Sequence, residues 1–166
     1  MTTPAPRPAR DRDPAGRPRN ARPRDEFGRP LGRGAAGEPP LPDEPALAPD
    51  AALDLAQRLI DSGRAFRAHE VLEASWKAAP PAERDLWQGL AQVAVGLTHA
   101  QRSNARGAAA LLRRGGQRVA GYADGPPHAV EAAQVARFAA ELADLIERDG
   151  LAAATPDALR VSLRSS

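Results

Sequence analysis

The feature that most constrains this chain is a run of 16 residues, Leu86–Gln101, without a single Asp, Glu, Lys or Arg, although 27% of all residues are charged. Its apolar residues recur at the three- and four-residue spacing of an α-helix. A helix that is uncharged on every side is normally buried against several neighbours. Gly89 and Gly96 disfavour this helix by about 1 kcal/mol each relative to Ala, which suggests close approach of another helix. We therefore expect a central helix in an all-α fold.

Helical spacing of apolar residues continues on both sides of this run, and no stretch alternates as a β-strand does. The expected helices cover residues 50–61, 65–79, 82–102, 104–121 and 127–148. Because the connections between them are short, neighbouring helices should be antiparallel. The prediction is a compact all-α bundle of about five helices, built from antiparallel helical hairpins, at residues 48–150. Residues 151–166 would follow as a C-terminal tail with a short helix near residues 156–160.

Local signals mark several helix ends. Asp50 and Asn104 are of the residue types that cap helix N-termini well, and Gly63 can end the first helix. Gly115 and Gly116 interrupt the fourth helix with residues that disfavour helix formation. We therefore expect this helix to be weakened and kinked there.

Residues 1–47 lack hydrophobic periodicity and are rich in Arg, Pro and Gly. The motif RDPAGRP at residues 12–18 recurs as RDEFGRP at residues 24–30, a spacing of 12. Because this composition offers little apolar surface to offset the entropy of ordering, we expect a disordered tail. Three roles stay open for it. It can be an anion-seeking arm, a short linear recognition element anchored by Phe27 and Leu31, or a solvated extension.

The chain contains no Cys, which excludes disulfides, thiolate metal sites and Cys nucleophiles. No apolar signal segment and no membrane-spanning helix is evident in the sequence. We therefore expect a cytoplasmic protein that does not enter a membrane.

The second expected helix carries an unusual set of polar residues within FRAHEVLEASW, residues 66–76. His69 and Glu73 lie one helical turn apart at the edge of the apolar face, whereas Glu70 should point away from it. Trp76 lies close to the same face. The polar residues that the central helix should turn toward this face are Gln88, Gln92 and His99.

Three interpretations of this polar site stay open. Its side chains can form a buried hydrogen-bond network that sets helix packing or holds a small ligand. A divalent metal such as Zn, Mn or Fe can bind His69, Glu73 and His99. Such a metal would polarise water for hydrolysis, with Glu70 or Glu73 as the base. Without a metal, a His–Glu pair can carry out acid–base catalysis. The sequence requires no cofactor and does not decide whether the protein is an enzyme.

The order of these residues resembles the domain-of-unknown-function 309 family, whose members are small all-helical proteins. The pattern is H-E-x-x-E-x-x-W, then Q-G-x-x-Q, then H, then N-x-x-G-A. The residues that carry it are His69, Glu70, Glu73, Trp76, Gln88, Gly89, Gln92, His99, Asn104, Gly107 and Ala108. The resemblance covers about residues 50–122, and Ser103 stands where the family usually has Gly. It implies the helical fold and no particular biochemical activity.

The region from Leu86 to Ala123 contains no acidic residue but five arginines. They are Arg102, Arg106, Arg113, Arg114 and Arg118. This candidate anion-binding surface can bind phosphate, nucleic acid or an acidic partner, or it is a solvated basic face partly paired with the acidic fifth helix. Exposed apolar helix faces would instead support a homo-oligomer or a protein partner.

Of these functions, we expect a non-enzymatic binding or structural module with a buried His/Glu/Gln polar site. The candidate residues of this site are His69, Glu70, Glu73, Trp76, Gln88, Gln92, His99 and Asn104. One alternative is a metal-binding or hydrolase-like protein that uses His69, Glu73 and His99. The other is anion or nucleic-acid binding through the Arg-rich tail and the fourth helix.

Overall fold

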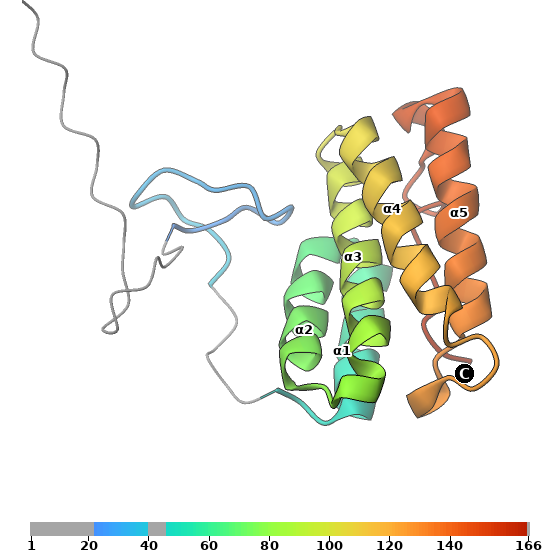
Figure 1. Cartoon of the computed structure of the whole chain (residues 1–166). Coiled ribbons are helices and arrows are strands. Elements are labelled where there is room, and N and C mark those ends of the chain that lie inside the picture. The colour runs from blue at the N-terminus through green and yellow to red at the C-terminus, as the bar shows by residue number, and fades with distance from the viewer. Residues whose placement is uncertain (1–21, 40–45, 166) are drawn as a thin grey trace, which may run out of the picture.

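The computed structural model describes residues 22–39 and 46–165. In these residues the chain forms five α-helices, which confirms the all-α prediction (Figure 1). They are α1 (Pro49–Asp61), α2 (Ala65–Ala78), α3 (Arg84–Gln101), α4 (Ala105–Ala120) and α5 (Ala132–Asp149). Part of the expected disordered tail, residues 1–21 and 40–45, lies outside the described residues. Across the two described ranges, no helix combines the length and the apolar character needed to cross a membrane.

The uncharged helix α3 occupies the centre of the bundle. It packs against α2 on one side and α4 on the other, while α1 packs on α2 and α5 packs on α4 (Figure 1). Leu86, Leu90, Val93 and Leu97 form its apolar stripe, and each is at most 1% exposed. Burying a side chain of this size stabilises the fold by about 1.5–3 kcal/mol. The absence of charge in α3 is therefore explained by contacts on both of its sides.

Two helices begin later than the sequence suggests. Pro81–Glu83 forms a separate 3-10 turn, so α3 starts at Arg84. Pro127–Ala129 forms another 3-10 turn, in which His128 and Ala129 have φ angles of 57° and 53°. Because positive φ angles cannot continue a right-handed α-helix, α5 starts only after this turn.

The helix ends agree with the predicted signals at two of three positions. Pro49 is the first residue of α1 and Asp50 lies in the first turn, so the prediction that Asp50 caps this helix is wrong. Proline suits this position because its missing N–H would have no partner there. Gly63 follows α1 with a φ of 75°. Asn104 caps α4 by accepting a hydrogen bond from the Gly107 N–H at 2.9 Å.

Glycines set how closely α4 approaches its two neighbours. A Cβ on Gly115 would lie 2.7 Å from the backbone oxygen of Gly89, so the close approach expected at Gly89 is present. On the other side of α4, a Cβ on Gly116 would lie 3.0 Å from the Cβ of Ala139 on α5. Because α4 remains one continuous helix, the predicted kink at these two glycines is wrong. They are contact positions at two helix crossings.

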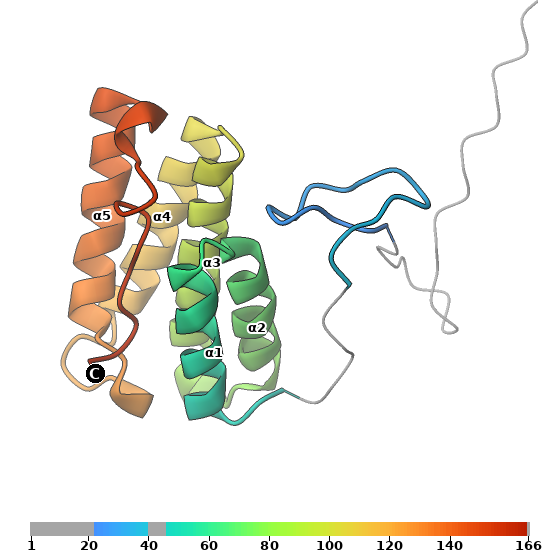
Figure 2. The same ribbon diagram turned by 180° about the vertical axis from the view of Figure 1, so that it is seen from behind.

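The residues after α5 return along the bundle between α1 and α5 (Figure 2). The short helix lies at Leu151–Ala153, and residues 156–159 form only hydrogen-bonded turns, so its predicted place is wrong. Gly150, with a φ of 79°, separates this 3-10 turn from α5.

The last described residues, 161–165, form what we call the strap. Its Val161 and Leu163 are 2% and 1% exposed and belong to the core. The Gln57 side chain on α1 donates to the Val161 oxygen at 3.0 Å and accepts from the Leu163 N–H at 2.7 Å. The Leu163 oxygen accepts from the Glu131 N–H at 2.8 Å. The strap therefore links the first helix to the start of the last.

Candidate functional site

Residues 22–39, within the expected tail, lie against the bundle where α2 begins and α3 ends (Figure 1). We call them the docked segment. Arg24 forms antiparallel bridges with Pro30 and with Glu38. The Leu31 N–H donates to the Pro23 oxygen at 2.8 Å. The segment is therefore folded back on itself.

The RDEFGRP motif builds the tip of the docked segment. The Asp25 carboxylate accepts hydrogen bonds from the N–H groups of Phe27 at 3.0 Å and Arg29 at 2.7 Å. The Gly28 N–H donates to the Asp25 oxygen at 2.9 Å, and the φ of Gly28 is 73°. The Arg24 guanidinium donates to the Gly28 oxygen at 2.5 Å. The Arg, Asp and Gly that recur in the two motifs are the residues that hold this turn.

Glu38 anchors the docked segment on α2. Its carboxylate accepts hydrogen bonds from Arg64 at 2.5 Å and from Arg67 at 2.8 Å. These bonds, first that of Arg64, lower the pKa of Glu38 and keep it ionised at neutral pH. Arg67 also donates to Glu70 at 2.9 Å and to the backbone oxygen of Pro39. One buried guanidinium thus holds three acceptors.

Arg67 was not among the predicted site residues, although it is only 7% exposed. Burial disfavours its charge, but the hydrogen bonds to Glu38 and Glu70 outweigh burial and raise the pKa of Arg67. The prediction that Glu70 points away is wrong, because a spacing of three residues places its carboxylate on the Arg67 guanidinium. The signal in the sequence was an arginine among the apolar residues of the second helix.

An aromatic ring and another arginine complete the surface under the docked segment. The guanidinium carbons of Arg24 and Arg102 lie 5.2 Å and 5.5 Å from the ring centre of Phe66. A Cβ on Gly28 would overlap the same ring. Arg102 donates from Nε to the Phe27 oxygen at 2.7 Å. We define the docking face as Arg64, Phe66, Arg67 and Arg102.

His69 lies beside the docking face, with its ring centre 5.8 Å from that of Phe66. Its Nε2 is 3.7 Å from a carboxylate oxygen of Glu73, which also pairs with Lys77 at 2.9 Å. Burial lowers the pKa of His69, although Glu73 acts in the opposite direction. The imidazole is therefore neutral at pH 7 and can accept a hydrogen bond. The structure brings His69 and Glu73 together, as their one-turn spacing predicts.

His99 has a different partner. Its Nδ1 lies 2.9 Å from the side-chain nitrogen of Asn104, the cap of α4. Burial, and then the charge of Arg102, lowers the pKa of His99. In the part of the chain that the structure describes, no three His, Asp or Glu side chains form a group that could hold a metal ion. The three candidate ligands are thus divided between a His69–Glu73 pair and a His99–Asn104 pair.

The remaining predicted site residues, Trp76, Gln88 and Gln92, are partly buried on α2 and α3. Three buried polar atoms on or next to these helices have no hydrogen-bond partner among the described residues. They are Nδ1 of His69, Oε1 of Gln92 and Nη2 of Arg102. A buried polar atom without a partner costs about 1–3 kcal/mol. An added polar group that reached these atoms would therefore bind favourably.

The five arginines of the candidate anion-binding surface have unlike surroundings. Arg113 pairs with Asp144 at 2.6 Å and with Glu147, and Arg118 pairs with Asp85 at 2.7 Å. Arg102 belongs to the docking face. Arg106 and Arg114 are exposed on α4. The acidic side of α5 thus neutralises part of this surface.

A polar cluster that the sequence did not reveal joins the two 3-10 turns before α3 and α5. The Glu83 carboxylate lies 2.8 Å from Nε2 of His128 and accepts a hydrogen bond from the Trp87 indole at 3.1 Å. The bond to His128, followed by that from Trp87, lowers the pKa of Glu83 despite burial. This cluster fixes the loop before α5 to α3.

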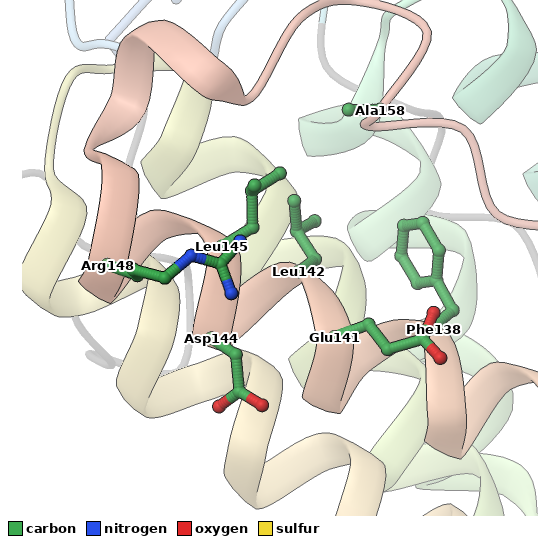
Figure 3. A pocket seen from close by; sticks show the side chains of 7 residues that line it. All are labelled: Phe138, Glu141, Leu142, Asp144, Leu145, Arg148 and Ala158. Carbon is green, nitrogen blue, oxygen red and sulfur yellow. The ribbon is translucent and has the colours of Figure 1, made fainter.

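A shallow open hollow of about 420 Å³ lies on the outer side of α5 (Figure 3). Its lining residues are Phe138, Glu141, Leu142, Asp144, Leu145, Arg148 and Ala158. Asp144 already pairs with Arg113, and Arg148 pairs with Asp149 at 2.8 Å. Because its charged groups have other partners, this hollow offers mainly apolar surface.

Comparison with known proteins locates the relationship in the first half of the bundle. Residues 53–111 match the family described as "Domain of unknown function (DUF309)", which confirms the resemblance drawn from the H-E-x-x-E-x-x-W pattern. "Uncharacterized protein YpuF" of Bacillus subtilis (strain 168) is 46% identical over 48 residues, which cover 28% of this chain and 28% of that protein. No solved structure matches the chain. The docked segment lies outside the matched residues.

Proposed function

We propose that this chain is a non-enzymatic binding module whose docking face holds a short peptide turn rich in Arg and Asp. The observation that carries this proposal is the seating of residues 24–38 on α2 and the end of α3. A chain of this composition has little apolar surface with which to fold alone. Its order is best explained by specific contacts to the bundle.

The contacts of the docking face suit a peptide ligand. Arg102 binds a backbone oxygen, and Arg67 binds both a backbone oxygen and a carboxylate. Phe66 contacts a guanidinium and the only turn position that requires glycine, Gly28. Paired charges, a cation–π contact and main-chain recognition recur in peptide-binding proteins. The selected features are an Arg, a tight Asp–Gly turn and a later Glu.

The other predicted functions remain less well supported hypotheses. The His69–Glu73 pair could act in acid–base chemistry, but a further group to bind or orient a substrate is not identified beside it. For metal binding, a third ligand would have to join His69 and Glu73 through a rearrangement. Anion or nucleic-acid binding would depend chiefly on Arg106 and Arg114, since Arg113 and Arg118 are paired with carboxylates.

Amide hydrogen exchange of the full chain tests the proposal. We expect protection at the N–H groups of Gly28, Leu31 and Glu38, which donate hydrogen bonds in the docked segment. Arg67→Met removes the buried donor and should accelerate exchange there by about 10- to 100-fold, as expected for a charged hydrogen bond. Lys77→Met, at an exposed pair on the same helix, is the matched control. Unprotected amides in the unmodified chain would refute the proposal.

A second measurement asks whether the face accepts a peptide supplied from outside. A synthetic peptide of residues 22–39 is added at several millimolar to the isotope-labelled full chain. We expect NMR signals of the labelled docked segment to move toward free positions, because the added peptide displaces it. A peptide carrying Gly28→Val should have no such effect. Equal effects of both peptides would show that the face does not select this turn.

A further inference from the structure

We propose that the docking face accepts either copy of the repeated motif, so that residues 12–26 of the same chain can replace residues 24–38 on it. This inference rests on the proposed function and names its second ligand. The RDPAGRP copy lies outside the described residues. The argument for it comes from the contacts that the RDEFGRP copy makes.

The residues that hold the docked turn are present in both copies. The turn depends on the Arg24 guanidinium, the Asp25 carboxylate and the positive φ of Gly28. The corresponding residues 12 positions earlier are Arg12, Asp13 and Gly16. The first copy can therefore form the same turn and present the same guanidinium to Phe66.

The two middle positions differ between the copies without loss of a contact. The Gly28 N–H bonds to the Asp25 oxygen, so Glu26 and Phe27 are the central residues of this turn. Pro14 replaces Glu26, and proline is favoured at the first central position of common turns. Phe27 contributes its backbone oxygen to Arg102, which any residue can supply. Ala15 suffices at this place.

The anchoring carboxylate also recurs at the same offset. Glu38, which binds Arg64 and Arg67, follows Arg24 by 14 positions, and Glu26 follows Arg12 by 14 positions. Glu26 belongs to the turn of the second copy. The two dockings are therefore mutually exclusive on one face.

Two differences make the second copy the resident ligand. A Cβ on Gly37 would lie 2.7 Å from the backbone oxygen of Arg24, and the equivalent position in the first copy is Asp25. The backbone there must shift before the first copy can dock. In addition, Glu38 precedes Pro49, where α1 begins, by 11 positions, whereas Glu26 precedes it by 23. The longer tether lowers the effective concentration by about threefold.

Hydrogen exchange by mass spectrometry on four full-length chains tests this inference. They are the unmodified chain, Gly16→Val, Gly28→Val and the double variant. Valine at residue 28 cannot adopt the positive φ readily and would overlap Phe66, so it removes the second copy as a ligand. We expect residues 27–38 to be protected in the unmodified chain and in Gly16→Val. In Gly28→Val, protection should move to residues 15–26, at least threefold weaker, and it should vanish in the double variant.

The outcomes separate this inference from the proposed function. Protection of residues 27–38 in the unmodified chain, with none at residues 15–26 in Gly28→Val, would overturn the inference and leave the proposed function intact. Lack of protection in the unmodified chain would overturn both. If protection of residues 15–26 in Gly28→Val rises with protein concentration, the occupant comes from a second molecule, which would overturn docking within one chain.

Discussion

Arg64 and Arg67 bind the same carboxylate, Glu38, but differ in burial: their side chains are 43% and 8% exposed. Methionine in place of Arg67 keeps much of the aliphatic volume but leaves Glu70 and Glu38 without their shared donor. We expect Arg67→Met to lower the free energy of unfolding by about 1–3 kcal/mol. Arg64→Met should cost about 0.2–1 kcal/mol, because exposed ion pairs contribute little. Urea denaturation measures both, and equal losses would contradict a special role for the buried arginine.

His69 predicts a pH dependence of stability. Burial lowers its pKa in the folded protein below the usual 6.5. As the pH falls below about 6.5, the unfolded chain therefore takes up a proton before the folded chain does, which favours unfolding. Stability should fall with decreasing pH until the folded pKa is reached, and then level off. Melting curves between pH 7.5 and 5 measure this loss.

The matched control for His69 is His69→Gln, which keeps a polar side chain that does not titrate. Between pH 7.5 and 5 the variant should lose less stability than the unmodified chain. A residual loss is expected, because burial lowers the pKa of His99 in the same direction. Parallel curves for the two proteins would contradict the lowered pKa of His69.

At the scale of helices, the crossing of α3 and α4 depends on a glycine that propensity would replace. Alanine at Gly115 would gain about 1 kcal/mol in helix propensity. Its Cβ would, however, lie 2.7 Å from the Gly89 oxygen and 2.8 Å from the Val93 nitrogen, and backbone atoms cannot rotate away. We therefore expect Gly115→Ala to lower the free energy of unfolding by about 1–3 kcal/mol. Gly125→Ala, with nothing within 4 Å, should be nearly neutral in the same denaturation experiment.

The helices were predictable because apolar spacing and the uncharged run act over short distances along the chain. Gly115 shows where this reasoning stops. Propensity alone predicts a kink, whereas the partner helix that makes a glycine necessary is visible only in three dimensions. Asp50 failed for a similar reason, because Pro49 can begin the helix one residue earlier. His69 and Glu73 were found together because their contact lies within one helix.

At the scale of the whole molecule, the contacts that sequence reasoning missed join residues far apart in the chain. Glu38 and Arg67 are 29 positions apart, and Gln57 and Leu163 are 106 apart. Composition argued against order before α1 and after α5, since it measures what a segment can do alone. Both described segments are instead held by side chains of the bundle. The signal that pointed to the docked segment was the 12-residue repeat, which composition does not weigh.

The strap makes the last prediction. Leu163 is 1% exposed, and the strap is the described segment that hydrogen-bonds to both α1 and the residue preceding α5. Leu163→Ala removes buried methyl groups from this junction and should lower the free energy of unfolding by about 2–5 kcal/mol. Leu47→Ala, at a side chain 44% exposed, should change it by less than about 0.5 kcal/mol. Amide exchange at Glu131, which donates to the Leu163 oxygen, should accelerate together with the loss of stability. If Leu163→Ala costs less than about 1 kcal/mol and Glu131 stays protected, the bundle is complete without its C-terminal residues.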